Sequence, residues 1–292
     1  MENQIKKYFS QENVSAKFKE LLGKKAPGFI TSVLQAVASN DLLSKATPES
    51  VFHATAIAAT LDLPINPNLG FAFIIPYNIK KDGQSVTLAQ FQVGWKGFVQ
   101  LAQRTGQFKT IGAAPIYEGQ LIESNPLTGF KFDFTQKKSN VIIGYAAYFS
   151  LINGFEKSYY MTADELKNHG VRFSQSFKKG YGLWKDDFDS MALKTVIKLL
   201  LSKFAPLSIE MQRAVVTDQA LITDSSTDNV TYIDNEQPVI DKEAERIALM
   251  IEDAQSIDDL NKLREYISEG QTELFADKME LLTSKTKKND SK

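Results

Sequence analysis

Two lysines stand one helical turn apart in a segment that is otherwise mostly apolar. Residues 184–204 read WKDDFDSMALKTVIKLLLSKF, with Lys194 and Lys198 four residues apart. Ser202 continues the same line, and Lys203 lies beside it. Side chains four residues apart share one face of a helix, and a helix so apolar elsewhere is buried on more than one side. We predict a buried helix with one cationic strip exposed to water. Such a helix could form the floor of an anion-binding groove. An ordinary core helix with one solvated edge is the alternative.

Motifs for nucleotide chemistry are missing from the sequence. There is no G-x-x-x-x-G-K-[ST] segment, and the G-x-G of Gly180 and Gly182 has Lys185 where a third glycine would stand. A P-loop and a dinucleotide-binding fingerprint both depend on those glycines. His53 and His169 lie far apart and the chain has no cysteine, so zinc sites and Ser-His-Asp arrangements have few candidates. We therefore expect no ATP-driven mechanism.

One pattern imitates a Mg²⁺-dependent nuclease. Asp133 is followed by Glu165 and Lys167, in the acid…E-x-K order that can hold Mg²⁺ beside a lysine. Thr162 stands three residues before Glu165, however, which is the spacing of a capping box at a helix start. A nuclease would need that glutamate on a strand beside the first acid. We therefore predict a protein without a catalytic site, and a Mg²⁺-dependent DNA nuclease is the alternative.

Basic residues are concentrated in the middle of the chain. The 292 residues have a formal net charge of −1. Residues 90–203 carry 15 Lys and Arg against 9 Asp and Glu, whereas residues 204–292 carry 10 against 19. A basic body with an acidic end is typical of nucleic-acid-associated proteins, and a chance imbalance between solvated faces is the alternative.

Targeting and membrane signals are absent from the sequence. It has no cysteine, no signal-peptide pattern and no apolar run long enough to span a membrane. We expect a soluble cytoplasmic protein that associates with the nucleoid when it acts on DNA.

Cations recur beside aromatic and amide side chains between residues 90 and 203. Lys and Arg neutralise phosphates, aromatic rings can stack bases, and amides can bond to sugars and base edges. The candidate DNA-binding residues are Lys96, Gln100, Arg104, Lys109, Lys178, Lys179, Lys185, Lys194, Lys198 and Lys203. The candidate base or sugar contacts are Gln90, Gln92, Trp95 and Trp184. Because Trp95 and Trp184 each open a helical segment, the pattern favours packing anchors over stacking platforms for both.

Hydrophobic periodicity predicts helices and strands in mixed order. Period-two segments at residues 70–77 and 85–94 predict a hairpin, and Asn153-Gly154 predicts a second one. Helical patterns lie between and after these strands, including residues 49–63 and 184–204. We expect an α+β fold, in which an antiparallel hairpin and sheet core is packed with helices.

Composition divides the chain into four regions. We expect an N-terminal arm over residues 1–25, a main domain over residues 26–222 and a polar linker over residues 223–240. Residues 241–292 then carry three capped helical patterns in an acidic module.

Four segments in unbroken order resemble the RecT family of phage recombinases. These are ATLDLPINPNLGFAFIIPY, AQFQVGWKGFVQLAQRTGQFKTI, VIIGYAAYF and WKDDFDSMALKTVIKLLLSKFAPLS. The family consists of single-strand annealing proteins related to phage Redβ. The similarity runs from about residue 27 to about residue 219.

The resemblance implies a function. Family members bind single-stranded DNA and anneal complementary strands without ATP, as helical filaments or rings that hold an annealed duplex intermediate in a basic groove. Mg²⁺ enters at most as an aid, and no other cofactor is implied. A phage exonuclease is the partner in the reaction, and the C-terminal module contacts the host single-stranded-DNA-binding protein. A passive single-stranded-DNA-coating protein remains an alternative.

The basic elements of the family's groove match two parts of this chain. Lys96, Arg104 and Lys109 match the first element, and Lys194, Lys198 and Lys203 match the second. The resemblance predicts two departures from the family: Lys80 and Lys81 stand in a longer hairpin loop, and Phe204 replaces a common Trp.

Overall fold

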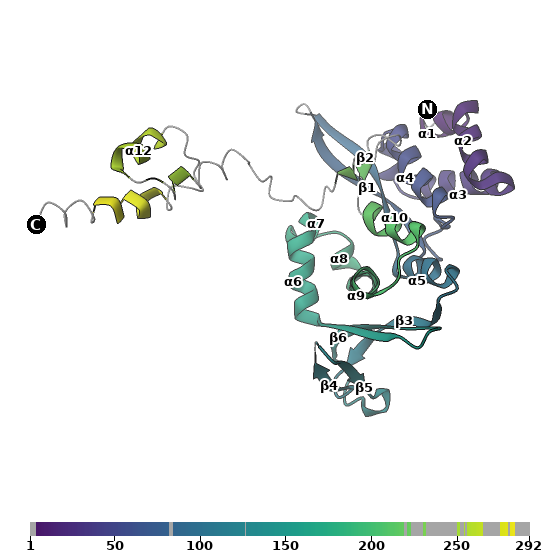
Figure 1. The fold of residues 1–292 in the computed structure, drawn as a ribbon. Coiled ribbons are helices and arrows are strands. Elements are labelled where there is room, and N and C mark those ends of the chain that lie inside the picture. Colours follow the sequence, from purple (N-terminus) through teal and green to yellow (C-terminus); the bar gives the residue numbers. More distant parts are fainter. Residues whose placement is uncertain are drawn as a thin grey trace, which may run out of the picture. The chain divides into compact units, whose positions relative to one another are not determined.

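The computed structural model divides the chain into two compact units, residues 1–235 and 236–292. The first unit is described over residues 4–81, 84–125, 127–218, 221–222 and 230–231. The second is described over residues 250–251, 254, 256–264, 275–279 and 281–283. The first unit mixes helices with antiparallel sheets, which confirms the α+β class (Figure 1).

Four helices form the N-terminal part of the first unit: α1 (Gln4–Phe9), α2 (Glu12–Leu22), α3 (Ala26–Ala38) and α4 (Pro48–Thr60). The sequence predicted an arm over residues 1–25, but α1 and α2 pack against α3 and α4 instead (Figure 1). Phe9 and Phe18 are buried in the main hydrophobic cluster, with their rings stacked 5.8 Å apart. Helices as short and charged as α1 and α2 would be only marginally stable in isolation. Burial of their aromatic rings stabilises them in the folded unit.

Strands β1 (Ala72–Lys81) and β2 (Gln84–Val93) form the first predicted hairpin. The register pairs Ala72 with Val93, and the turn at residues 82–83 lies outside the described residues. Alternation of side chains gives the hairpin one face that packs on α4. The Ala89 N–H donates to Ser50 Oγ at 2.9 Å, which ties β2 to the first turn of α4.

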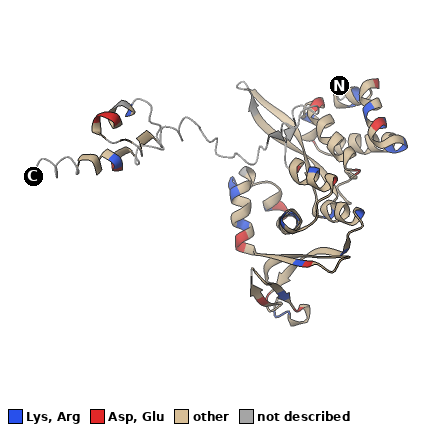
Figure 2. Ribbon diagram, in the orientation of Figure 1, with Lys and Arg blue, Asp and Glu red and all other residues tan. Residues whose placement is uncertain are grey.

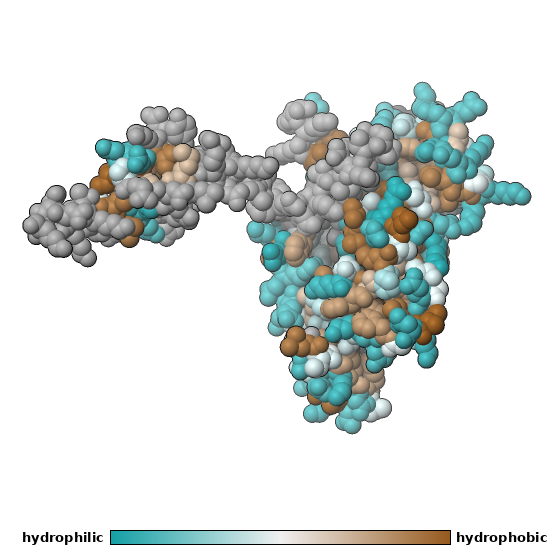
Figure 3. Space-filling view, viewed as in Figure 1, coloured by the Kyte–Doolittle hydropathy of each residue, from teal (hydrophilic) through white to brown (hydrophobic). Residues whose placement is uncertain are grey.

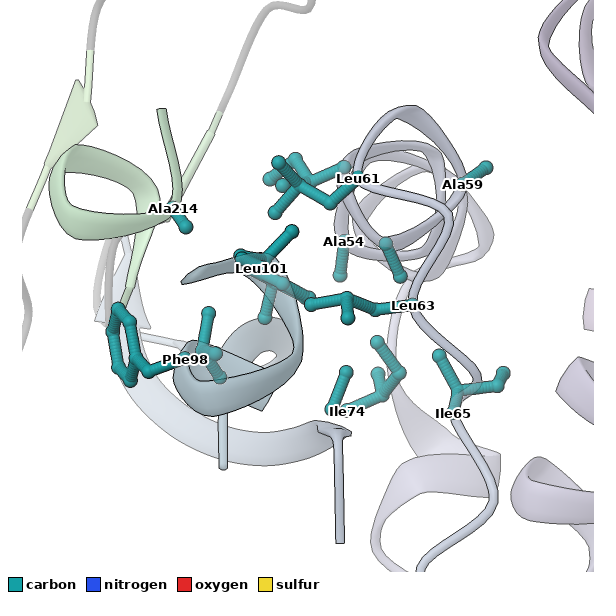
Figure 4. Packing of buried hydrophobic residues seen from close by; sticks show 14 of the residues in the cluster. Ala54, Ala59, Leu61, Leu63, Ile65, Ile74, Phe98, Leu101 and Ala214 are labelled. Carbon is teal, nitrogen blue, oxygen red and sulfur yellow. The ribbon is translucent and has the colours of Figure 1, made fainter. Parts of the chain in front are cut away.

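Helix α5 (Trp95–Arg104) follows β2 and lies very close to the backbone of Phe71, the residue before β1. A Cβ atom added to Gly97 would lie 2.1 Å from the Phe71 carbonyl oxygen, so only glycine fits there. The close approach lets α5 bury its apolar side. Figure 4 shows Leu101 of α5 pointing toward Leu61 and Leu63, which follow α4.

A three-stranded antiparallel sheet with the order β3-β6-β7 forms the second half of the first unit. The strands are β3 (Phe108–Tyr117), β6 (Ile142–Leu151) and β7 (Glu156–Thr162). The turn between β6 and β7 contains the predicted Asn153-Gly154 pair. A small hairpin, β4 (Leu121–Asn125) and β5 (Gly129–Phe132), lies on the opposite side of this sheet from the helix of the lysine pair (Figure 1).

The connection after β7 consists of helices. They are α6 (Ala163–Phe173), the single turns α7 (Gln175–Lys178) and α8 (Leu183–Asp186), α9 (Phe188–Phe204) and α10 (Ile209–Thr217). Helix α9 packs against α5, α8 and all three strands of the sheet. Ala192, Val196, Ile197, Leu200 and Leu201 of α9 are fully buried. The sequence prediction that this helix is buried on more than one side is confirmed.

Little of the C-terminal region belongs to the described residues. Short strands β8 (Leu221–Ile222) and β9 (Val230–Thr231) pair with each other. The second unit contains α12 (Ile257–Lys262) and a small apolar cluster that includes Ile251 and Leu260. Most of the predicted linker (223–240) and much of the predicted module (241–292) lie outside the described residues, so this division remains a prediction.

No helix among the described residues is long and apolar enough to cross a membrane. On the face shown in Figure 3, hydrophobic and hydrophilic residues of the first unit are intermixed.

Candidate nucleic-acid interface

The lysine pair of α9 binds a buried carboxylate. Lys194 Nζ lies 2.8 Å from Asp218 Oδ1, and Lys198 Nζ lies 2.8 Å from Asp218 Oδ2. The Lys194 side chain is 7% exposed and that of Lys198 is 25% exposed. The expectation of a strip with both ammonium groups in water was therefore wrong for Lys194. Asp218, which follows α10, draws that lysine inward.

Asp218 is held from three sides. Besides the two lysines, the Val93 N–H at the end of β2 donates to Asp218 Oδ1 at 2.9 Å. Burial opposes ionisation of this carboxyl group, but Lys194 and Lys198 outweigh burial and keep the pKa of Asp218 below its usual range. The carboxylate and its two lysines together carry one positive charge. Sequence reasoning missed Asp218, because it is a single acid far from both partners along the chain.

Cations lie over aromatic rings on the neighbouring elements. Lys203 Nζ lies 4.8 Å from the ring centroid of Tyr159 on β7 and donates to its hydroxyl at 3.2 Å. Lys157 Nζ lies 5.1 Å from the ring centroid of Phe204 at the end of α9. Both distances are typical of cation–π contacts. The ring of Phe204 therefore has a cation above it.

Helix α6 continues this arrangement. The Arg172 guanidinium lies 5.1 Å from the ring centroid of Phe173. A trough of about 610 Å³ runs along β7 and α6. We give the name cation–aromatic surface to six residues in and beside this trough: Lys157, Tyr159, Arg172, Phe173 and Phe204 line the trough, and Lys203 contacts Tyr159. Figure 2 shows basic residues on α6 and α9, next to the acidic start of each helix.

Only Lys203 of the cation–aromatic surface was a candidate from the sequence. Phe204 ends α9 itself, and the other members come from β7 and from the end of α6, which are separated from α9 in sequence. Alternation of Lys157 and Tyr159 along β7 places them on one face of the sheet, and this was the available signal. The sequence did not show that α9 packs across that face.

The α5 candidates have different environments. Arg104 donates to the Leu61 carbonyl at 2.8 Å and to the Asp62 carbonyl at 2.7 Å. Its guanidinium thus binds the end of α4, a packing role that the DNA-contact prediction did not anticipate. Lys96 is exposed, with Nζ 5.9 Å from the Trp95 ring centroid, and Gln100 is half-buried.

The remaining candidate cations lie at the surface. Lys109 on β3 and Lys178, Lys179 and Lys185 in the α6–α9 connection are exposed. They remain predicted DNA contacts.

The candidate base contacts are mostly inside the folded chain. Gln92 Nε2 donates to Gln90 Oε1 at 3.1 Å and to Tyr77 Oη at 3.2 Å, and both glutamines are buried. Trp184 is 5% exposed and packs against the rings of Phe177 and Phe188. The packing role expected for Trp184 is confirmed. Trp95 is half-buried beside the main cluster.

His169 lies between the lysine pair and the cation–aromatic surface. Its ring centroid is 4.6 Å from that of Phe173 and 6.2 Å from that of Trp184. Burial first, and then the charges of Lys198 and Arg172, lower the pKa of His169 to about 4. The imidazole is therefore neutral at pH 7.

The nuclease-like residues form local contacts. Glu165 Oε2 accepts from the Thr162 N–H at 2.8 Å, and Thr162 Oγ1 accepts from the Glu165 N–H at 3.1 Å. The predicted capping box is thus confirmed. Asp133 accepts from Thr135 in the turn after β5. Within the described part of the chain, no three His, Asp or Glu side chains gather as a metal site.

The fold and this surface define a class of protein. An α+β unit with cations over aromatic rings along one strand and two helices has the groups that bind nucleic-acid backbones and stack bases. The profile of the RecT family matches residues 27–233, and the chain belongs to this family.

Two relatives align with most of the chain. The uncharacterized protein YqaK of Bacillus subtilis (strain 168) is 46% identical over 237 residues, which are 80% of this chain and 79% of YqaK. Protein RecT of Escherichia coli (strain K12) is 28% identical over 207 residues, 68% of this chain and 73% of that protein. Membership of the RecT family implies single-stranded-DNA binding and a function in recombination by strand annealing, and the family is generally non-catalytic.

Proposed function

We propose that this chain anneals complementary DNA strands without ATP in phage recombination, acting as a helical filament or ring. The cation–aromatic surface, in a chain of the RecT family, is the observation that carries this proposal. Annealing requires that repulsion between two phosphate backbones be cancelled, and lysines do this by releasing counterions. It also requires unpaired bases to be exposed to a partner strand, and aromatic faces accept bases without sequence preference.

Oligomerisation belongs to the same proposal. A single subunit binds few nucleotides, and an array of subunits on one strand raises the effective concentration of each further contact. Exposed lysines would extend the backbone contacts along the array: Lys96, Lys109, Lys178, Lys179 and Lys185.

The acidic C-terminal module is proposed to bind proteins. Residues 241–292 carry 13 Asp and Glu against 9 Lys and Arg, a net negative charge that suits DNA poorly. A phage exonuclease and the host single-stranded-DNA-binding protein are the proposed partners, in the cytoplasm and at the nucleoid. Mg²⁺ is at most an aid.

An annealing assay tests the proposal. Two complementary fluorophore-labelled oligonucleotides are mixed with the protein, without ATP, over a series of salt concentrations. We expect acceleration that fades as salt rises, and an annealing rate at least about tenfold lower in the double variant Lys157→Gln/Lys203→Gln. Lys19→Gln removes an exposed lysine from α2 and serves as the control with unchanged rate.

Two results would replace the proposal. Binding without acceleration would define a passive single-stranded-DNA-coating protein. Cleavage of the strands that stops with a chelator would define a Mg²⁺-dependent nuclease and would direct attention back to Asp133 and Glu165.

A further inference from the structure

A small cavity lies beside the lysine pair. It has a volume of about 180 Å³ and is walled by α6, α8 and α9. His169 and Phe173 line it from α6, Trp184 from α8, and Lys198 and Ser202 from α9. His169 and Phe173 also line the trough along β7, so the two hollows share a wall.

The charge at this cavity favours an anion. Lys194, Lys198 and Asp218 together carry one positive charge, and Lys198 is the more exposed of the two lysines. Partial burial lowers the local dielectric, which strengthens attraction to an anion. The 2.8 Å contact with Asp218 already orders Lys198, so binding an anion costs little further side-chain entropy.

The other lining groups suit a phosphate oxygen. Ser202 Oγ is exposed, and its hydrogen bond to the Leu199 carbonyl is long, at 3.3 Å, so the hydroxyl can turn to an incoming acceptor. Neutral His169 retains one N–H donor. Trp184 and Phe173 form apolar walls that limit the width of the cavity.

We infer that this cavity is a subsite for one phosphodiester group of a DNA strand, with Lys198 and Ser202 as its principal ligands. The inference rests on the proposed function, because it names a place where the annealing protein would bind the DNA backbone. If the bases of a DNA strand lie along the trough, one phosphate of that strand could reach the cavity on the other side of His169 and Phe173.

Fluorine NMR on the full chain tests the subsite. The protein has two tryptophans, so labelling with 5-fluorotryptophan gives two resonances, which Trp95→Phe assigns. The probes are tripolyphosphate, which has backbone-like charge without bases, and a thymidine oligonucleotide. We expect a saturable shift of the Trp184 resonance with both probes, because Trp184 forms a wall of the cavity.

Three variants make the test specific. Lys198→Gln removes the charge, and Ser202→Asp places a repulsive carboxylate in the lining while keeping Lys194, Lys198 and Asp218 in the chain. Each should weaken tripolyphosphate binding by about tenfold or more. Lys19→Gln, on α2, makes the same charge change as Lys198→Gln and should leave the titration unchanged.

Failure of the subsite and failure of the function are distinguishable. No Trp184 shift, or equal affinities in the wild type and both cavity variants, overturns the subsite. Strand annealing is measured on the same wild-type sample. Annealing without a Trp184 response keeps the proposed function and rejects the subsite, whereas a specific tripolyphosphate response without annealing supports the subsite and rejects the function.

Discussion

At the scale of single residues, the first unit is organised by a buried carboxylate. Asp218 joins α9, the end of α10 and the last residue of β2 through contacts of 2.8 to 2.9 Å. Such a cluster is costly to desolvate and more costly to break, because removing one partner leaves an uncompensated buried charge. We therefore assign Asp218 to the stability of the first unit and to the placement of Lys198.

Replacement of Asp218 should be strongly destabilising. Asp218→Asn leaves two lysines near a neutral amide, and we expect the free energy of unfolding to fall by about 3 kcal/mol. Urea denaturation followed by circular dichroism measures it. Asp164→Asn is the matched control, because the Asp164 side chain is 86% exposed in its ion pair with Lys167 and should contribute less than about 0.5 kcal/mol. Equal losses in the two variants would contradict this assignment.

The low pKa of His169 predicts a pH dependence of stability. The folded value is about 4, against an ordinary value of 6.5. Between these two pKa values His169 is protonated in the unfolded chain but not in the folded protein. The free energy of unfolding therefore falls as the pH is lowered from 6.5 to about 4. His169→Gln removes the effect.

Urea denaturation at pH 7.5 and at pH 5 measures this dependence. The wild type should lose about 1 kcal/mol more than His169→Gln on acidification, after allowance for partial solvent screening. The charges facing His169 are Lys198 on α9 and Arg172 on its own helix. Identical pH profiles would show that His169 protonates normally in the folded protein.

At the scale of elements, sequence patterns predicted the features that depend on residues close together in the chain. The Asn153-Gly154 turn, the Thr162–Glu165 capping box and the buried circumference of α9 are each encoded within a few residues. The Arg104 contacts with the end of α4 and the packing of α1 and α2 depend on partners distant in sequence, so periodicity did not predict them.

The contact between α5 and the Phe71 backbone should tolerate no added atom. Gly97→Ala would place a Cβ atom 2.1 Å from the Phe71 carbonyl oxygen, and we expect a loss of about 2 kcal/mol or more in the free energy of unfolding. Gly28→Ala in α3 is the control, because nothing lies within 4 Å of its added Cβ. That change should be neutral or stabilising by up to about 1 kcal/mol. Thermal denaturation measures the stability of both variants. A Gly97→Ala protein as stable as the wild type would contradict the close packing of α5 against the Phe71 backbone.

At the scale of the whole molecule, the sequence predicted the family and class of ligand better than the residues of the interface. Charge distribution and four ordered segments pointed to a RecT-family protein, and the family match over residues 27–233 agrees. Of the candidate contacts, Lys194, Gln90, Gln92 and Trp184 are buried and Arg104 binds α4. Spacing along a helix predicts the direction in which each side chain points. Whether the side chain then contacts water or a carboxylate depends on the element packed beside the helix.

The salt dependence of single-stranded-DNA binding tests the central claim most directly. For single strands, each phosphate neutralised contributes about 0.7 to the slope of log K against log salt concentration. If Lys157 and Lys203 of the cation–aromatic surface bind backbone, Lys157→Gln/Lys203→Gln should lower the magnitude of that slope by roughly 1.4 relative to wild type and to Lys19→Gln. A slope that stays at the wild-type value in the double variant would place the DNA elsewhere on the molecule.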